Sequence, residues 1–267
     1  MNQAKWSAPP ESFRRRAARP ALVGHRGTRG VLPENTLEAI DLAYAQGADA
    51  VEIDVRTCRT GEVVVLHDPD LERVARDPRR AADLDLRDLR KVDLGGGARV
   101  PLLADVLEQT RTRGLGLNVE IKHDVPSPVE TVRAVARELS RSPHREVIVS
   151  SFDPRLLAAH KALCRIPLFH AQLVQRSSYH HVALLVARLG LFEGLHVEQV
   201  LAYPRRLGPF LAQRPGYVAA WTVNDPFEAR RLAGEGVSAL ISDVPGKLLA
   251  AFGVGDQRSD AAATTTG

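Results

Sequence analysis

The sequence predicts an α/β protein that folds as a single-domain (β/α)8 TIM barrel. Eight short β-rich runs alternate with amphipathic segments, the order expected when helices connect parallel strands. The length of 267 residues suits one such barrel. Polar residues follow the ends of several runs, where barrel enzymes carry their active sites. An open, doubly wound parallel sheet is the alternative architecture with the same alternation.

The β-rich runs are the predicted strands. They cover residues 21–25, 50–55, 116–122, 146–152, 167–174, 194–200, 217–223 and 238–244. Helical patterns cover residues 34–46, 102–113, 128–140, 154–163, 179–189, 204–213, 226–235 and 245–252. Asn35 and Ser127 are typical helix N-caps, and Gly114 is a typical helix stop.

One further apolar run, EVVVLHD at 62–68, follows the second strand closely and predicts a short hairpin or extension. Residues 69–101 include prolines and a Gly-Gly-Gly triplet, so we expect a long loop with a short helix. The terminal segments are polar. We expect residues 1–20 to form a flexible basic tail, residues 21–253 the barrel, and residues 254–267 a disordered tail.

The composition narrows the class of partner. The net charge is +4, but aromatic residues make up only 5% and are not interleaved with basic ones, so we expect no nucleic-acid partner. No apolar run approaches the ~18 residues of a membrane helix, so we expect no stable membrane insertion. No signal peptide is recognisable and the two cysteines lack a disulfide or zinc spacing, so a cytoplasmic location is expected. The oligomeric state is left open.

Three carboxylates stand near the ends of neighbouring predicted strands. Glu52 and Asp54 share one face of the second strand, and Glu120 lies in the third. Adjacent buried carboxylates repel one another and lose hydration, so they require a cation nearby. Hard oxygen ligands of this kind suit Mg²⁺ or Ca²⁺. The alternative is a set of salt bridges with Arg26 and Lys122.

Two histidines also end predicted strand segments. His25 and His67 titrate near neutral pH, so one could accept a proton from a nucleophile while the other donates to a leaving oxygen. Arg26 and Lys122 offer fixed positive charge for a phosphate group. Asn224 and Asp243 also lie at strand ends, but we interpret them as caps of loops and helices. His196 and Glu198 share a face near the sixth strand end, where they could line the pocket.

The ordered motifs GHRG, ENT, EIDV, HD, NVEIK, WTVND and ISDVP closely resemble those of the glycerophosphodiester phosphodiesterase family, over roughly residues 21–247. The resemblance implies a barrel that hydrolyses glycerophosphodiesters to glycerol 3-phosphate and an alcohol with a divalent cation. Position by position, it makes His25 and His67 the acid–base pair. It also implies that Glu52, Asp54 and Glu120 are metal ligands, that Arg26 and Lys122 contact phosphate, and that Trp221 lines the substrate pocket. Core packing at the barrel rim is the alternative for Trp221.

The chain departs from the family pattern at two places. CRTGE replaces the usual K-D-G-like turn before His67, although Gly61 is kept, and VSALISD replaces VDGIITD in the last strand. The first change should leave the turn intact and removes no catalytic residue, and the second puts substrate preference in doubt, not activity. Two functional alternatives remain: lysophospholipase D-like hydrolysis of a lipid phosphodiester, and a barrel that binds phosphodiesters without catalysis. The sequence does not tell whether the nucleophile is water or the substrate's own 2-hydroxyl.

Overall fold

The structure is a computed structural model, and it describes residues 8–176, 191–202 and 217–253. Eight parallel strands form a closed ring in the order β1, β2, β6, β7, β8, β9, β10, β11, with β11 pairing back onto β1. The ring consists of β1 (Ala21–His25), β2 (Ala50–Thr57), β6 (Gly116–Ile121), β7 (Val147–Ser151), β8 (Phe169–Val174), β9 (Gly194–Glu198), β10 (Tyr217–Trp221) and β11 (Ala239–Ser242). The predicted TIM barrel is therefore confirmed, and the open sheet is excluded.

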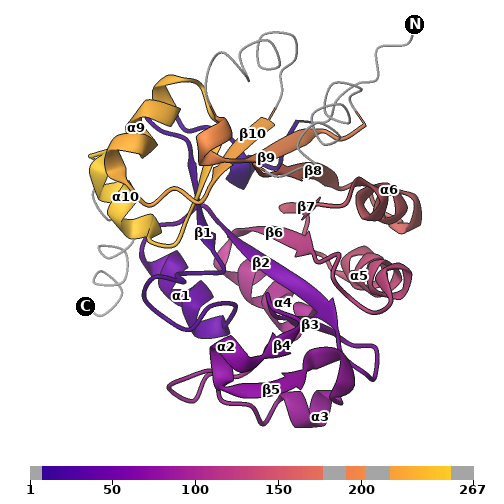
Figure 1. Cartoon of the computed structure of the whole chain (residues 1–267). Coiled ribbons are helices and arrows are strands. Elements are labelled where there is room, and N and C mark those ends of the chain that lie inside the picture. Colours follow the sequence, from indigo (N-terminus) through magenta and orange to yellow (C-terminus); the bar gives the residue numbers. More distant parts are fainter. Residues whose placement is uncertain (1–7, 177–190, 203–216, 254–267) are drawn as a thin grey trace, which may run out of the picture.

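Helices surround the ring (Figure 1). Those connecting ring strands are α1 (Leu37–Ala45), α4 (Leu103–Arg113), α5 (Pro128–Arg141), α6 (Pro154–Leu163) and α9 (Pro226–Gly234), and α10 (Pro245–Ala251) follows the last strand. The helical patterns at 179–189 and 204–213, including His180 and His181, lie outside the described residues. A 3-10 turn, η3 (Gln199–Leu201), follows β9.

Alternation along each strand separates two kinds of buried surface. Val51, Ile53 and Val55 on β2 are fully buried among helix residues such as Leu103 and Val135, as expected for the outward face of a barrel strand. Side chains of the other face fill the barrel interior, among them Ala21, Val23, Ile148, Phe169, Tyr217 and Ala239. This apolar packing closes the barrel at the amino ends of its strands. The polar side chains of the interior therefore gather at the carboxyl ends of the strands.

Part of the segment expected as a loose N-terminal tail is packed. The 3-10 turn η1 (Glu11–Phe13) places Phe13 in the barrel interior with 1% exposure, edge-on to Tyr217. Arg19 donates to Asp49 at the start of β2. The expectation of a flexible tail over residues 1–20 is thus wrong for residues 8–20, because Phe13 supplies the apolar contact that seals the amino end of the barrel. The flexible-tail expectations for residues 1–7 and 254–267 lie outside the described residues.

Residues 69–101 are more ordered than a loop with one short helix. They contain β4 (Asp70–Leu71), α2 (Glu72–Ala75), β5 (Asp77–Arg80), the 3-10 turn η2 (Ala81–Asp83) and α3 (Leu86–Leu89). The hairpin strand β3 (Val63–Val65) pairs antiparallel with β2, as the sequence predicted. Leu71, Leu89 and Val100 share an apolar cluster with Val64 and Leu66, so this insertion has a small core of its own. The insertion lies at one side of the barrel, at the lower edge of Figure 1.

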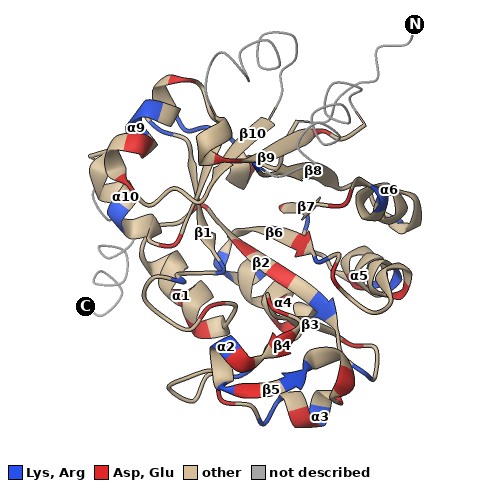
Figure 2. Ribbon diagram, in the orientation of Figure 1, with Lys and Arg blue, Asp and Glu red and all other residues tan. Residues whose placement is uncertain are grey.

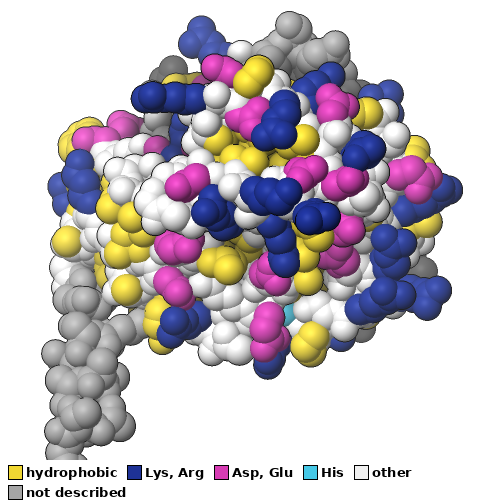
Figure 3. Space-filling model, turned by 90° about the horizontal axis from the view of Figure 1, so that it is seen from below, with side chains coloured by type: hydrophobic (Ala, Val, Ile, Leu, Met, Phe, Trp, Pro, Cys, Tyr) yellow, Lys and Arg dark blue, Asp and Glu magenta, His cyan; other side chains and the backbone are white. Residues whose placement is uncertain are grey.

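Charged residues are spread over the molecule instead of gathering by sign. Acidic and basic positions lie close to one another along α2, β5 and α3 in the insertion (Figure 2). On the face seen from below, Lys and Arg side chains are interspersed with Asp and Glu (Figure 3). Exposed ion pairs such as Arg59–Asp85 and Lys91–Asp88 account for part of this pattern, and each contributes little to stability.

Candidate active site

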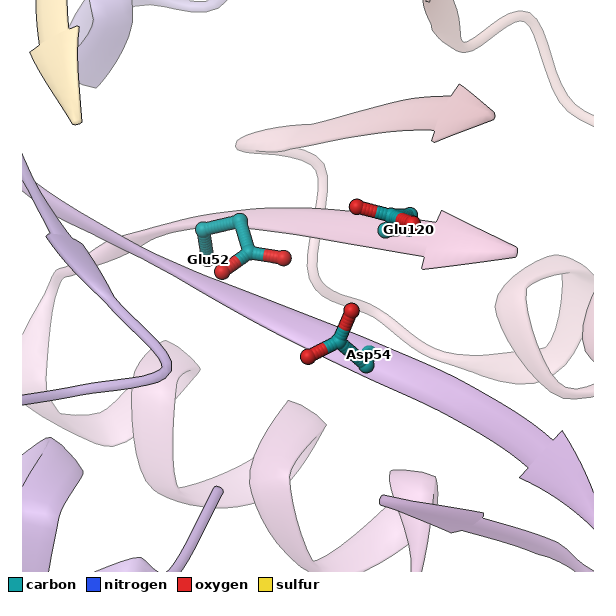
Figure 4. Close-up of side chains that lie close together, drawn as sticks. All are labelled: Glu52, Asp54 and Glu120. Carbon is teal, nitrogen blue, oxygen red and sulfur yellow. The ribbon is translucent and has the colours of Figure 1, made fainter. Parts of the chain in front are cut away.

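The three predicted metal ligands lie together. Glu52 and Asp54 project from β2, and Glu120 projects from the neighbouring β6, where the backbone register pairs Asp54 with Glu120 (Figure 4). One carboxylate oxygen of each lies within 4.8 Å of the others, and all three side chains are buried. The period of two along β2 and the parallel pairing with β6 produce this cluster.

Two cations partly neutralise the cluster. Lys122 Nζ lies 2.9 Å from Glu120 Oε1 and 3.3 Å from Asp54 Oδ1, and Arg26 Nε lies 3.1 Å from Asp54 Oδ2. Burial opposes ionisation of Asp54, but the charges of Lys122 and Arg26 hold its pKa well below the ordinary value. The salt bridges considered as the alternative are therefore present. They satisfy Asp54 and Glu120.

Glu52 receives less compensation, from the charge and backbone N–H of Arg26 alone. Burial, with the charges of Asp54 and Glu120, raises the pKa of Glu52 well above its ordinary value. Its Oε2 accepts a hydrogen bond from the backbone N–H of Arg26 at 3.1 Å, but its buried Oε1 has no hydrogen-bond partner within the described chain. An unpartnered carboxylate oxygen beside two other carboxylates fits a divalent cation, which would allow Glu52 to ionise.

Asn35 has a role that its position in the sequence did not reveal. The N-cap of α1 is Thr36, whose hydroxyl accepts from the Ala39 N–H, so the expected Asn35 cap is wrong. Asn35 adopts a left-handed conformation with φ of 59°, which turns its side chain toward β2. Its amide donates to Asp54 Oδ2 at 3.0 Å and accepts from the Asp54 N–H at 3.2 Å. Asn35 thereby fixes Asp54 from both sides. Ser127 does occupy the N-cap position of α5, without a side-chain capping bond.

Each predicted acid–base histidine is held by a carboxylate. His25 Nδ1 lies 2.6 Å from Asp243 Oδ1, and His67 Nδ1 lies 2.7 Å from Asp68 Oδ1. These bonds occupy Nδ1 and leave Nε2 of each ring for the cavity; His25 Nε2 lies 3.9 Å from Glu52 Oε2. Burial, together with the charges of Lys122 and Arg26, lowers the pKa of His67 despite the nearby carboxylates.

Asp243 and Asn224 do more than cap loops, so that interpretation was incomplete. Asn224 Nδ2 donates to Asp243 Oδ2 at 2.7 Å, while its Oδ1 accepts from the Asp243 N–H at 2.9 Å. Asp243 is thus held in place, with its other carboxylate oxygen on His25. The contact between His25 and Asp243 joins the ends of β1 and β11, and these two strands are neighbours in the closed barrel.

Arg56 is a second residue whose role was missed. It follows Asp54 by two positions on β2 and is 3% exposed. Its guanidinium donates to the backbone oxygen of His67, at 2.9 Å from Nε, and to the Asp124 carboxylate, at 2.8 Å from Nη2. Arg56 therefore links the segment that carries His67 to the loop that follows Lys122. The sequence signal was only its period-two spacing from Glu52 and Asp54.

A cavity of about 270 Å³ lies at the carboxyl ends of the strands. Seven of the eight predicted site residues line it: His25, Arg26, Glu52, His67, Glu120, Lys122 and Trp221. Asp54, the eighth, is in contact with the lining residues Arg26 and Lys122.

The cavity lining also includes the apolar side chains of Phe152, Leu173, Trp221 and Ile241. Trp221 packs edge-on against Phe152 with ring centroids 5.7 Å apart, so it both lines the cavity and contacts the core. His196 lines the cavity, as considered from the sequence, whereas Glu198 accepts from the backbone N–H of Arg176.

The combination of closed barrel, carboxylate cluster and paired histidines defines a class of protein. Residues 25–247 match the glycerophosphoryl diester phosphodiesterase family, and the chain belongs to this family. A glycerophosphodiester phosphodiesterase of Caldanaerobacter subterraneus is 28% identical over 250 residues, covering 85% of this chain and 96% of the relative.

Solved structures agree with this membership. A phosphodiesterase of Oleispira antarctica, in complex with the product sn-glycerol-3-phosphate, is 28% identical with a TM-score of 0.79, over 88% of this chain and 97% of that one. The glycerophosphodiester phosphodiesterase of Thermotoga maritima is also 28% identical, with a TM-score of 0.73, over 86% and 97% of the two chains. Among the described helices of the present chain, none combines the length and apolar character needed to cross a membrane.

Proposed function

We propose that this protein hydrolyses glycerophosphodiesters to glycerol 3-phosphate and an alcohol, with Mg²⁺ or Ca²⁺ bound by Glu52, Asp54 and Glu120. The observation that carries the proposal is the cavity in which two carboxylate-held histidines face this cluster. Membership of the family and the product complex of the Oleispira relative support it. A divalent cation held there would supply Lewis-acid activation and orient the phosphate.

The other side chains of the cavity bind the phosphate, transfer protons and contact the substrate. Arg26 and Lys122 border the cavity with fixed positive charge and contact the phosphate oxygens. His25 and His67 form the acid–base pair: one accepts the proton of the attacking hydroxyl, and the other protonates the departing alkoxide through Nε2. Their carboxylate partners fix the tautomer, because each occupies Nδ1. Trp221, with Phe152, provides the apolar wall against which the substrate lies.

The proposal includes a small-molecule substrate and a cytoplasmic location. Both cysteines, Cys58 and Cys164, are free thiols, which is compatible with a reducing compartment. Nucleic acid and stable membrane insertion are not part of the proposed function. The lipid phosphodiesterase and the binding-only barrel are outcomes of the test below.

The test is the release of glycerol 3-phosphate from glycerophosphocholine, glycerophosphoethanolamine and glycerophosphoglycerol with Mg²⁺, with Ca²⁺ and with EDTA. We expect cation-dependent turnover that EDTA abolishes. If a well-folded sample shows no turnover with any pairing, the proposal is wrong. Hydrolysis of a lysophospholipid in the same assay would then favour the lipid activity, and binding without turnover the sensing role.

His67→Ala tests the acid–base assignment. We expect kcat to fall by about 10²–10⁴, the usual contribution of general acid–base catalysis. His144→Ala is the matched control, because His144 precedes β7 at the opposite end of the barrel. The control variant should keep its kcat even if its thermal midpoint falls. Equal kcat values in the two variants would contradict the role of His67.

A further inference from the structure

A second cavity of about 200 Å³ lies beside the catalytic one. Arg29, Glu34 and Arg73 provide its charged lining, and Leu32, Pro33 and Val74 provide apolar lining. Arg29 also lines the catalytic cavity, so its side chain stands between the two. It belongs to the turn after β1, where its backbone N–H lies 3.4 Å from the carbonyl oxygen of His25. A group attached to a phosphate beside His25 therefore has Arg29 as a near neighbour.

Some N–H donors of the Arg29 guanidinium are not hydrogen-bonded to described residues. Its Nε donates to Glu34 Oε2 at 2.9 Å, and its two terminal nitrogens make no hydrogen bond to any described residue. Arg73 differs, since its Nε donates to Asp68 Oδ2 and both terminal nitrogens donate to Glu34. The side chain of Arg29 is 40% exposed, compared with 8% for Glu34. Arg29 thus presents a free pair of N–H donors at the boundary of the cavities.

The carboxylates around Arg29 are shared among several guanidinium groups. Glu34 faces three guanidinium groups, those of Arg26, Arg29 and Arg73, and Asp68 faces Arg73. Arg26 also contacts Asp54, and the charge of Arg29 acts on Asp243, so the group as a whole has no net positive excess. Because all three guanidinium nitrogens of Arg73 are bonded, it is Arg29 and not Arg73 that has donors available to a ligand. A planar guanidinium with two free donors binds carboxylate and phosphate groups in a forked geometry.

We propose that Arg29 and the second cavity form a subsite for an anionic head group, so that the enzyme prefers diesters whose alcohol carries a carboxylate. This inference rests on the proposed hydrolysis of glycerophosphodiesters. A head group ending in an ammonium alone offers no acceptor to the free N–H donors of Arg29, whereas a carboxylate accepts two charge-assisted hydrogen bonds from them. Specificity arises from the difference between these two interactions.

Glycerophosphoserine and glycerophosphoethanolamine are the matched substrates, because they differ by a single carboxylate. The quantity measured is the ratio of their kcat/KM values. We expect the unaltered enzyme to prefer the serine diester, and Arg29→Met to lower the ratio by about 10- to 100-fold, the usual range for hydrogen bonds to a charged group. Arg113→Met is the control, because Arg113 has similar exposure and one ion pair, with Asp41, but ends α4 at the far end of the barrel.

The outcomes separate the two proposals. A ratio that is unchanged in Arg29→Met, with equal losses for both diesters, would show that Arg29 acts on the shared phosphate or only supports Glu34. The subsite would then be wrong while the hydrolytic function stands. A ratio that falls equally in Arg113→Met would show a non-local charge effect and would also overturn the subsite. Turnover of neither diester by the unaltered enzyme would overturn the hydrolytic function, and the subsite with it.

Discussion

Asp243→Asn is a near-isosteric change that addresses how His25 is positioned. In the structure, both neighbours of the Asp243 carboxylate are donors: the Nδ1–H of His25 at 2.6 Å and the Nδ2–H of Asn224 at 2.7 Å. An asparagine offers one acceptor and one donor. Its amide nitrogen must therefore face either Asn224, where two donors meet, or His25, where it forces the Nδ1 of the ring to be unprotonated. The second arrangement leaves His25 in the wrong tautomer for accepting a proton at Nε2.

The size of the effect follows from these two arrangements. Loss of a hydrogen bond between charged groups costs about 1.5–3 kcal/mol, which corresponds to a factor of about 10–150 in rate. Loss of the correct tautomer removes the acid–base contribution of His25 as well, about 10²–10⁴. We therefore expect kcat to fall by at least about tenfold and by up to about 10⁴. KM should change much less, because Asp243 does not contribute to the cavity lining.

The assay is steady-state release of glycerol 3-phosphate with saturating cation, combined with calorimetry of cation binding. Cation affinity should be retained, since Asp243 is outside the three-carboxylate cluster. Asp225→Asn is the matched control: Asp225 lies two positions before Phe227, and its side chain caps α9 by accepting from the Glu228 N–H. A kcat in Asp243→Asn within threefold of the control value would refute the argument that this carboxylate positions His25.

Three further predictions concern the metal site, the pH dependence of stability and the amino-terminal segment. Glu120→Ala removes one of three ligands and should weaken cation binding by more than about tenfold in calorimetry; unchanged affinity would contradict the three-carboxylate site. Burial raises the pKa of Glu138, on α5, to about 7 from 4.5, so its contribution to stability is present below pH 4.5 and lost as the pH rises through 7. Glu138→Gln should therefore gain stability relative to the unaltered protein between pH 5 and pH 8 in urea unfolding, and a constant difference would contradict this sign. Phe13→Ala should lower the free energy of unfolding by about 3–5 kcal/mol with little change in kcat, and a loss below 1 kcal/mol would mean that Phe13 does not seal the barrel.

The fold and the cavity-lining residues could be predicted because they depend on local patterns. Strand periodicity places Glu52 and Asp54 on one face, and parallel pairing brings Glu120 beside them. Because the strands are parallel and the barrel is closed, the carboxyl ends of all the strands lie at the same end of the barrel. These rules do not depend on the conformation of the loops, so motifs far apart in the sequence could be assigned to one site.

The remaining contacts depend on geometry that no local pattern encodes. The bond from Asn35 to Asp54 requires a left-handed backbone at Asn35, and asparagine before a helix is equally typical of a cap. The insertion was underestimated because strands as short as Asp70–Leu71 show no periodicity. Phe13 lies between polar and basic neighbours, Ser12 and Arg14, so its burial follows only from the shape of the barrel that it enters.

The bond between His25 and Asp243 links residues 218 positions apart, across the seam where β1 meets β11. The carboxylate cluster needs only β2 and β6, which pair directly and lie in the first half of the chain. Cation binding and turnover thus report on different stages of assembly. During refolding we expect affinity for the cation to return no later than turnover, which must await the joining of the last strand to the first. Weakening the pairing between β1 and β11 should separate cation binding from turnover. The resulting protein would bind its cation without turning over substrate.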